Sequence, residues 1–213
     1  MNPICLLLVP VCFAVLHART GKYPFSAAVT LSCLVSVLYW ADPRITAAYA
    51  FSIVGDWFMA HSGGENGKRR LLCGIVGFFL AHLCFLLYGL SRIDLSGKRL
   101  LWLIPAGALL VGYALFLSKK LLPAIPDLSL KAAASAYTVV SLLVMTDSLL
   151  SSEPALPKTL FCLGIALILF SDTLIAMSRF LGNRAVGRYI CPTYFACHIL
   201  IAASIMAQAG FMG

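Results

Sequence analysis

The chain consists of long apolar runs separated by short segments that hold most of its prolines and charged residues. Each run is close to the roughly 20 residues that an α-helix needs to cross the hydrocarbon core of a bilayer. The sequence therefore predicts eight spans, at residues 3–18, 24–41, 45–61, 71–91, 100–118, 132–150, 158–178 and 189–211. Because the loops between them are short, we expect an all-α polytopic membrane bundle that forms a single transmembrane domain over residues 1–213.

Composition supports this class and argues against a soluble protein. Of the 213 residues, 61% are hydrophobic and 11% are charged, whereas soluble domains have roughly 45–50% apolar and about 25% charged residues. The basic residues behind the net charge of +8 occur in short groups between the apolar runs, which indicates membrane topology rather than a nucleic-acid partner. The eight cysteines lie within or beside apolar runs without a CxxC pair, so we expect small buried apolar side chains.

The distribution of lysine and arginine predicts which side of the membrane each loop faces. The loops after odd-numbered spans hold eleven of these residues: Arg19, Lys22, Lys68, Arg69, Arg70, Lys119, Lys120, Lys131, Arg179, Arg184 and Arg188. The loops after even-numbered spans hold five: Arg44, Arg92, Lys98, Arg99 and Lys158. Because cytoplasmic loops carry the excess of positive charge, both termini are predicted to lie outside. We expect a multi-pass protein of the cell membrane, or of the inner membrane in a bacterium.

A few ionisable side chains lie well inside the predicted spans, where a charge costs about 2.5–3.5 kcal/mol on insertion scales. They are Asp56, His82, Asp172 and His198. Measured from the odd-loop ends of their spans, the aspartates lie roughly 8–10 Å deep and the histidines roughly 13–17 Å. Tyr137 and Tyr194 fall at a depth similar to that of the aspartates. We therefore expect all six side chains to line one polar chamber that opens toward the cytoplasmic leaflet.

The spacing of these residues indicates an internal repeat. Asp56 precedes His82 by 26 residues, and Asp172 precedes His198 by the same distance. Each aspartate is also followed four residues later by an alanine. The pattern predicts two four-helix halves in the same orientation, with a site at the interface between them.

Ordinary structural roles compete with these functional ones. A lone histidine inside a membrane is more often a helix-bridging hydrogen-bond partner than a catalyst, and two aspartates could form a polar clasp between helices. Two unpaired acids at one depth would repel each other, which favours a site over a clasp. Asp147, near the outer end of the sixth span, is expected to reach the interface. The loop acids Asp42, Asp94, Asp127 and Glu153 are expected to be solvated.

Several segments inside the spans carry a family resemblance. They are Gly55-Asp56, Phe79-Leu80-Ala81-His82, Ala136-Tyr137 leading to Met145, Leu169-Phe170-Ser171-Asp172-Thr173-Leu174-Ile175-Ala176 continuing to Arg179-Phe180, and Thr193-Tyr194-Phe195-Ala196. From about residue 20 to 205 the chain resembles the lysoplasmalogenase-like (YhhN) family of eight-span membrane proteins. The Ser-Asp-x-x-x-Ala helix followed by the Thr-Tyr helix is the most specific part. Two positions depart from the family pattern: Tyr23 separates Lys22 from Pro24, and His198 stands where members tend to carry glutamine.

The resemblance implies hydrolysis of the vinyl ether bond of lysoplasmalogens to a fatty aldehyde and a glycerophospho-alcohol, with Asp56 and Asp172 as the catalytic pair. This chemistry needs a carboxylic acid to protonate the β-carbon, and a carboxylate to stabilise the oxocarbenium ion and activate water, as in glycosidases. Ser171 beside Asp172 favours Asp172 as the ionised partner and Asp56 as the acid. Polar contacts to the substrate are expected from His82, Tyr137, Tyr194, Ser171 and His198. Contacts to its phosphate are expected from Lys22, Lys68, Arg69, Arg70 and Arg179.

Other functions fit the same residues. Paired intramembrane acids are also typical of small-solute or proton-coupled transporters, although no span has the mid-helix break of a discontinuous helix. The two aspartates and two histidines could bind zinc in a metal-dependent hydrolase, although no short motif such as HExxH is present. A structural or regulatory role is the third alternative. The lipid hydrolase is the preferred hypothesis. It needs no cofactor, and its substrate would be a lysophospholipid or ether lipid of the surrounding membrane. The sequence leaves the oligomeric state open.

Overall fold

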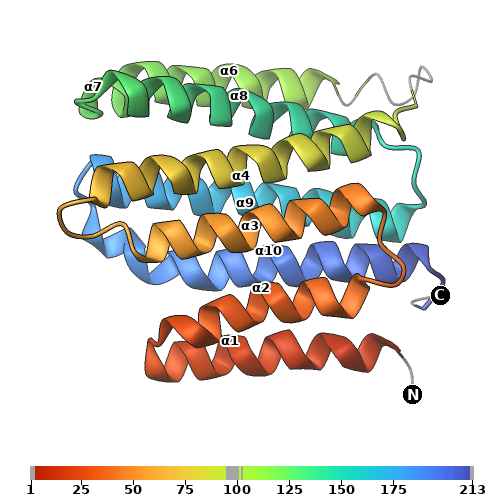
Figure 1. Ribbon diagram of the computed structural model, residues 1–213. Coiled ribbons are helices and arrows are strands. Elements are labelled where there is room, and N and C mark those ends of the chain that lie inside the picture. The colour runs from red at the N-terminus through yellow and green to blue at the C-terminus, as the bar shows by residue number, and fades with distance from the viewer. Residues whose placement is uncertain (1–2, 95–100, 102, 212–213) are drawn as a thin grey trace.

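A computed structural model describes residues 3–94, 101 and 103–211. Most of these residues form helices that run back and forth in one bundle (Figure 1). The long helices are α1 (Leu8–Thr20), α2 (Tyr23–Val37), α3 (Pro43–Ala60), α4 (Gly67–Leu90), α6 (Leu103–Phe116), α8 (Leu128–Leu150), α9 (Ala155–Phe180) and α10 (Gly187–Gln208). A 3₁₀ segment, η1 (Pro3–Leu7), precedes α1, and another, η3 (Arg184–Val186), precedes α10. Helix α6 continues through a π-helical segment, η2 (Leu117–Leu121), into the short α7 (Leu122–Ala124). Within these ranges no strand forms, and Ile93 and Ser151 make an isolated bridge.

Five stretches are long and apolar enough to cross a membrane, namely Gly67–Leu90, Leu103–Ala124, Leu128–Leu150, Ala155–Phe180 and Arg184–Gln208. Two shorter apolar helices, Cys5–Thr20 and Tyr23–Val37, pack beside them. The expected all-helical membrane bundle is therefore confirmed. That all eight helices cross the bilayer, and in which direction, stays a prediction.

The helix boundaries follow local chemistry more closely than they follow hydropathy. The second span was predicted to reach residue 41, but α2 ends at Val37. Pro43 occupies the first turn of α3 and restricts the residue before it, while the Asp42 side chain caps the helix by accepting from the Arg44 N–H. Both effects favour a turn over a continued helix. The start of the fifth predicted span, with the loop residues Lys98 and Arg99, lies outside the described residues.

Two closely packed helix pairs, α3–α4 and α9–α10, form the centre of the bundle, and α1 and α6 lie at its two edges (Figure 1). Glycines allow the pairs to approach. A Cβ on Gly77 would lie 3.0 Å from the Cα of Gly55, and one on Gly164 would lie 2.7 Å from Ile201 Cγ1. Small residues at such contacts are typical of membrane helices, where packing rather than water exclusion holds helices together.

The outer helices pack reciprocally between the two halves of the chain. Helix α2 of the first half packs against α10 of the second, and α8 of the second half packs against α4 of the first. A parallel repeat of four helices predicts this exchange, because equivalent helices then make equivalent contacts. The repeat itself stays a prediction.

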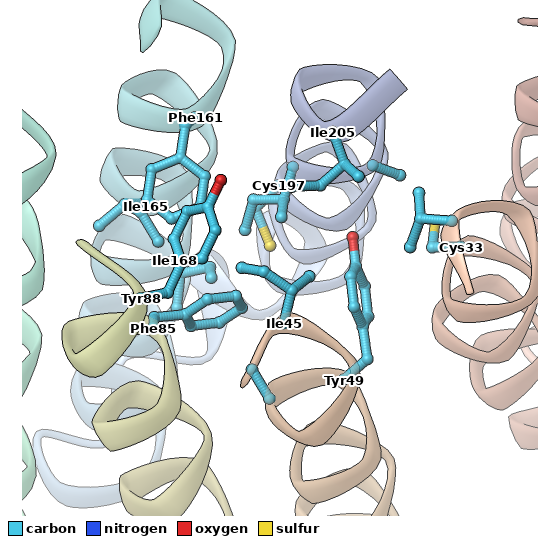
Figure 2. Close-up of a cluster of buried hydrophobic side chains, with 14 of the residues drawn as sticks. Cys33, Ile45, Tyr49, Phe85, Tyr88, Phe161, Ile165, Ile168, Cys197 and Ile205 are labelled. Atoms are coloured by element: carbon cyan, nitrogen blue, oxygen red, sulfur yellow. The ribbon is translucent and has the colours of Figure 1, made fainter. Parts of the chain in front are cut away.

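The largest buried cluster draws side chains from α2, α3, α4, α8, α9 and α10, and Figure 2 shows part of it. Ile45, Tyr49 and Phe85 are fully buried in it. The Tyr49 hydroxyl donates to the carbonyl oxygen of His198 at 2.8 Å, so its polar end is satisfied within the core. All eight cysteines are free thiols. Cys33 and Cys197 belong to the buried cluster as expected, whereas Cys5 in η1 and Cys12 in the outer helix α1 are exposed.

The connections α2–α3 and α8–α9 and the C-terminal ends of α4 and α10 lie at one end of the bundle (Figure 1). Four charged residues there form an ionic cluster: Asp42, Arg44, Arg92 and Glu153. Arg44 Nη2 binds Asp42 at 2.7 Å, and Arg92 Nε binds Glu153 at 2.6 Å. At the opposite end Lys68 pairs with Asp127 at 2.5 Å. The prediction that these loop acids are merely solvated was therefore wrong for Asp42, Glu153 and Asp127. Asp42 pairs with Arg44 only two residues away, whereas the fold brings Arg92 to Glu153 and Lys68 to Asp127.

Candidate active site

The predicted site residues lie around two adjoining cavities at the end of the bundle opposite the ionic cluster, which we call the cavity end. The first cavity has a volume of about 320 Å³ and contains Asp56 and Tyr194 in its wall, with His17, Tyr23 and Arg179. The second has a volume of about 70 Å³ and contains Asp172 and Tyr137, with Tyr113 and Arg179. The sequence predicted a single chamber; the described structure has two that share part of their walls.

Asp56 projects from α3 into the larger cavity, among hydroxyl groups rather than cations. Thr30 of α2 donates its Oγ1–H to Asp56 Oδ2 at 3.2 Å. The Tyr194 hydroxyl of α10 is a close neighbour of the same carboxyl group, although it lacks a hydrogen bond of good geometry within the described chain. The Asp56 carboxyl therefore retains free acceptor positions that face the cavity.

Asp172 begins a chain of hydrogen-bonding groups that runs from α9 through α8 to α4. The Tyr137 hydroxyl donates to Asp172 Oδ2. The same hydroxyl lies 3.4 Å from His82 Nε2. His82 Nδ1 donates to the carbonyl oxygen of Phe78 at 2.9 Å, so Nε2 of the neutral ring is left as an acceptor that faces Tyr137.

A wall of large flexible side chains separates the two carboxyl groups. Met59, Phe78 and Ile175 line both cavities, as does Arg179. Gly55 and Gly74 make room for this wall, since a Cβ on Gly55 would lie 2.9 Å from the Phe78 ring and one on Gly74 would lie 2.8 Å from Met59 Cγ.

Arg179 lines both the Asp56 and the Asp172 cavity. It stands at the C-terminal end of α9, and its Nη2 donates to Ser62 Oγ at 2.7 Å. Among the described residues it forms no ion pair. Its charge is therefore available to an anionic group at the mouth of either cavity.

The remaining predicted site residues lie at the margin of the cavities or behind them. Lys22 is exposed beside Gly21 and Tyr23, which line the larger cavity. Ser171 is fully buried, and its hydroxyl donates to the carbonyl oxygen of Ile190 at 3.2 Å rather than to Asp172.

His198 lies in the buried cluster behind Tyr194. Its ring meets that of Tyr194 edge-on at 4.5 Å, both ring nitrogens are buried without a partner in the described structure, and it lines neither cavity. A role in substrate binding for Lys22, Ser171 or His198 stays a prediction.

Three residues near the carboxyl groups were not predicted from the sequence: Thr30, His17 and Tyr113. Thr30 and Tyr113 are single polar groups in apolar spans, which are common on any membrane helix. His17 lies at the end of the first span, where its Nδ1 donates to the Lys22 carbonyl oxygen at 3.1 Å. The packing of α1 and α2 against α10, and of α2 against α3, brings His17 to the Asp56 cavity and Thr30 to the Asp56 carboxyl group.

Each aspartate is served by residues of the other half of the chain. Asp56 of the first half faces Tyr194 of the second, and Asp172 of the second half reaches His82 of the first through Tyr137. This exchange follows from the reciprocal packing of α2 on α10 and of α8 on α4. The arrangement is that of a site at the interface between two halves.

The possible metal ligands are dispersed over the bundle. Among the residues that the structure describes, no three His, Cys, Asp or Glu side chains come together in a group that could hold a metal ion. His82 meets Asp172 only through the Tyr137 hydroxyl, and His198 lies behind Tyr194. The four-ligand zinc site that the residue types allowed is therefore not assembled in this part of the chain.

Comparison with known proteins gives a family and nothing more specific. No curated protein matches the chain, and no solved structure matches it. The sequence does match the YhhN family from residue 4 to residue 205, a range that contains both cavities and every residue that lines them. This protein belongs to the YhhN family.

Proposed function

We propose that this protein is a membrane hydrolase that cleaves the vinyl ether bond of lysoplasmalogens, with Asp172 as general acid and Asp56 as general base. One observation carries the proposal: two carboxyl groups without cationic partners in the described chain face adjoining cavities across a shared wall, and one of them ends a hydrogen-bonded chain. The proposal requires one or two side chains of that wall to rotate, so that the cavities connect when substrate binds. A vinyl ether needs one protonated and one ionised carboxyl group, as an oxocarbenium-forming glycoside does. Membership of the YhhN family supports the substrate class.

The Asp172–Tyr137–His82 chain is fully satisfied when Asp172 carries a proton. In that state Asp172 donates to the Tyr137 oxygen, Tyr137 donates to His82 Nε2, and His82 donates to the Phe78 carbonyl oxygen. With Asp172 ionised, Tyr137 must donate to Asp172 instead, and His82 Nε2 is left without a donor. Buried polar groups are nearly always paired, so the chain favours Asp172 as the acid. This assignment is the reverse of the one based on Ser171, whose hydroxyl is used elsewhere.

Asp56 suits the complementary role. It has a hydroxyl donor in Thr30, a second hydroxyl beside it in Tyr194, and a cavity of about 320 Å³ in front of it. That volume holds water as well as part of a substrate, since a water molecule occupies about 30 Å³ in the liquid. A carboxylate there can stabilise a cation in the connected cavities and take a proton from water.

The cations at the cavity end are placed to hold the phosphate of the substrate. Arg179 lines both cavities without an ion pair in the described chain, and Lys22 stands at the margin of the larger cavity. Phosphate in the larger cavity puts the glycerol oxygen and C1 of the alkenyl chain near Asp56. The β-carbon, which is the next atom along the chain, then points across the wall toward Asp172.

The reaction follows with all protons accounted for. Asp172 gives its proton to the β-carbon, and the positive charge on C1 and the ether oxygen is stabilised by the Asp56 carboxylate. Water adds to C1 as Asp56 removes its proton, which gives a hemiacetal. Asp56 then returns that proton to the glycerol oxygen as the C1–O bond breaks. The hemiacetal hydroxyl proton passes to Asp172, so the aldehyde leaves and both carboxyl groups regain their starting states.

The proposal includes an orientation. Both cavities lie at the end that carries the odd-numbered loops and most of the lysines and arginines. By the positive-inside rule this end faces the cytoplasm, which would give the enzyme access to lysolipids of the inner leaflet.

The decisive experiment measures aldehyde release by purified protein in nanodiscs from a lysoplasmalogen and from the matching ester-linked lysolipid. We expect turnover of the vinyl ether only. Asp172→Asn and Asp56→Asn should each lower kcat by about 10³-fold, within the range of general acid–base contributions. Asp147→Asn is the matched control, because it removes a buried carboxyl group of the same bundle far from both cavities.

The other outcomes separate the alternative functions. Aldehyde release that is lost on treatment with a chelator and restored by zinc would replace the acid–base pair with a metal site. Counterflow of a small solute without hydrolysis of either lipid would identify a transporter. Equal loss of activity in all three Asn variants would remove the special role of Asp56 and Asp172.

A further inference from the structure

The second cavity is too small for a whole lipid chain. Its volume is about 70 Å³, whereas sites for drug-sized ligands occupy roughly 300–1,000 Å³. It can take the reacting end of the substrate beside Asp172, but the rest of the hydrocarbon chain must lie elsewhere. The wall of this cavity shows where a chain could continue.

An apolar groove of about 390 Å³ adjoins the Asp172 cavity on the lipid-facing side of α6 and α9. It is lined by Leu109, Tyr113 and Phe116 of α6, Leu169, Phe170 and Thr173 of α9, and by Met145 and Ala166. Tyr113 and Leu169 also line the Asp172 cavity, so these two side chains lie between the two spaces. Leu109 and Phe170 are 41% and 52% exposed, which places the groove at the surface that faces lipid.

A single hydrogen bond closes the junction between groove and cavity. The hydroxyl oxygens of Tyr113 and Thr173 are 3.0 Å apart. Thr173 already donates its proton to the Leu169 carbonyl oxygen at 2.7 Å, so Tyr113 is the donor in this pair. Thr173 is the residue after Asp172 in the sequence, and the junction therefore lies next to the proposed acid.

Helix α6 is the element best able to move at this junction. It is the least buried of the membrane-length helices, and Ala106 is its one buried residue. Directly after it the backbone widens into the π-helical segment η2. Such segments occur frequently at functional sites and interrupt the regular helical hydrogen bonds. A small rotation of α6 would carry Tyr113 away from Thr173 and open the groove to the cavity.

We propose that the groove between α6 and α9 holds the hydrocarbon chain of the lysolipid and that the Tyr113–Thr173 pair gates its entry from the membrane. The proposal rests on the proposed function. The chemistry requires the hydrocarbon chain to continue from the Asp172 cavity, because the β-carbon lies on the chain side of the ether oxygen and must meet Asp172. A larger groove of about 590 Å³ between α1 and α10 adjoins the Asp56 cavity instead. Most of its lining is apolar, but it lies beside Asp56 rather than Asp172 and includes Arg188 and His17, so we assign it to the head-group side of the substrate.

The first test measures binding and does not depend on turnover. A non-hydrolysable alkyl-ether lysophospholipid with a diazirine at the chain end is photolysed with the protein in nanodiscs of diacyl lipid. We expect saturable labelling of α6 and α9 that excess unlabelled alkyl lysolipid displaces. Leu109→Trp, which fills the groove, should lower the displaceable labelling about tenfold, the size of effect that a misfit in an apolar pocket produces.

Val111→Trp is the matched control. Val111 lies two residues from Leu109 on the same helix, is 62% exposed and does not line the groove, so its labelling should equal that of the wild type. Labelling that is uniform over the lipid-facing surface, concentrated on α1 and α10, or equally reduced by both tryptophans would overturn the proposal.

The second test compares turnover of lysoplasmalogens with long and short alkenyl chains. Leu109→Trp should raise KM about tenfold for a long chain and leave a chain too short to reach the groove unchanged. Saturable groove labelling by a protein that hydrolyses neither substrate would sink the hydrolase and keep the groove. Hydrolysis of both chains with the same KM in wild type and Leu109→Trp, together with uniform labelling, would sink the groove and keep the hydrolase.

Discussion

The two ends of this bundle treat carboxyl groups in opposite ways. In the ionic cluster Asp42 and Glu153 are bound by Arg44 and Arg92, and the Arg92 guanidinium also lies 4.0 Å from the centre of the Tyr88 ring. At the cavity end Asp56 and Asp172 are bound by hydroxyl groups instead. An arginine partner fixes a carboxylate in its ionised form, whereas a hydroxyl partner can serve either form.

Asp42 illustrates how an arginine partner keeps a carboxyl group ionised. The hydrogen bond from the Arg44 side chain lowers the pKa of Asp42 from 3.8 to about 2. A carboxyl group held in this way cannot exchange a proton near neutral pH, so the ionic cluster is a structural clasp. At the cavity end no cation pairs with Asp56 or Asp172 within the described residues, so both carboxyl groups can gain and lose a proton, as proton transfer requires.

Asp147 shows that a buried carboxyl group is not sufficient for a site. It was expected to reach the interface, but it is 3% exposed and neither of its oxygens has a partner in the described structure. It packs directly against Gly89 of α4, and none of the cavities described above includes it. The cavity end thus differs from Asp147 in having space and hydroxyl groups around the acid.

The largest expected effect contrasts two tyrosines at the two ends. Tyr137→Phe interrupts the chain between Asp172 and His82 and should lower kcat for aldehyde release by about 10²-fold. Tyr88→Phe removes a hydroxyl that donates to Gln208 Oε1 at 2.9 Å near the ionic cluster, and should leave kcat within about twofold of wild type because it touches neither cavity. Steady-state kinetics measure both. Equal losses would mean that the hydroxyl chain has no catalytic part.

The second prediction concerns stability and has opposite signs at the two ends. Arg92→Met removes the charged partner of Glu153 and should lower the free energy of unfolding by about 2 kcal/mol. Asp172→Asn should leave it unchanged or raise it while activity is lost, since no cation depends on Asp172. Thermal unfolding in detergent measures both, with the exposed Arg69→Met as control. A large loss of stability in Asp172→Asn would assign it a structural role.

The third prediction addresses the contact between Gly89 and Asp147. A methyl group on Gly89 would collide with the Asp147 carboxyl group, so Gly89→Ala should lower stability by about 2 kcal/mol, as overpacked sites do. The same change should cost much less in an Asp147→Ala background. Gly112→Ala, which meets nothing within 4 Å, is the control. Additive effects in the double variant would show that the two residues do not touch.

The smallest expected effect is a pH dependence at the ionic cluster. Because the pKa of folded Asp42 is lowered to about 2, its contribution to stability is complete above about pH 4 and is lost as the pH falls through 2. The difference in unfolding free energy between wild type and Asp42→Asn should be about 1 kcal/mol at pH 5 and vanish near pH 2. An acid exposed at the cavity end, Glu65, gives the control variant Glu65→Gln. A difference that does not change with pH would mean that Arg44 does not hold the carboxylate.

Much of the bundle could be predicted from the sequence because lipid imposes a strong rule. Every span in a bilayer must satisfy its own backbone, so long apolar runs become helices, and the observed helices overlap the predicted ranges. The prediction failed at Val37, where it ran four residues too far, because apolar residues also suit the turn before Asp42-Pro43. It also treated Asp127 and Glu153 as solvated, because their ion pairs depend on which helices are neighbours, and it missed the local pair of Asp42 with Arg44.

The sequence by itself determined that Asp56, Asp172, His82 and Tyr137 lie within apolar helices, because the cost of burying such groups makes them conspicuous in any membrane segment. Only the tertiary structure decided which groups meet. It joined Asp172 to His82 through Tyr137, gave Thr30 to Asp56, turned Ser171 toward Ile190, and placed His198 behind Tyr194. The physical reason is that depth along a helix follows from residue number, whereas the direction of a side chain and its partner follow from how the helices pack around it.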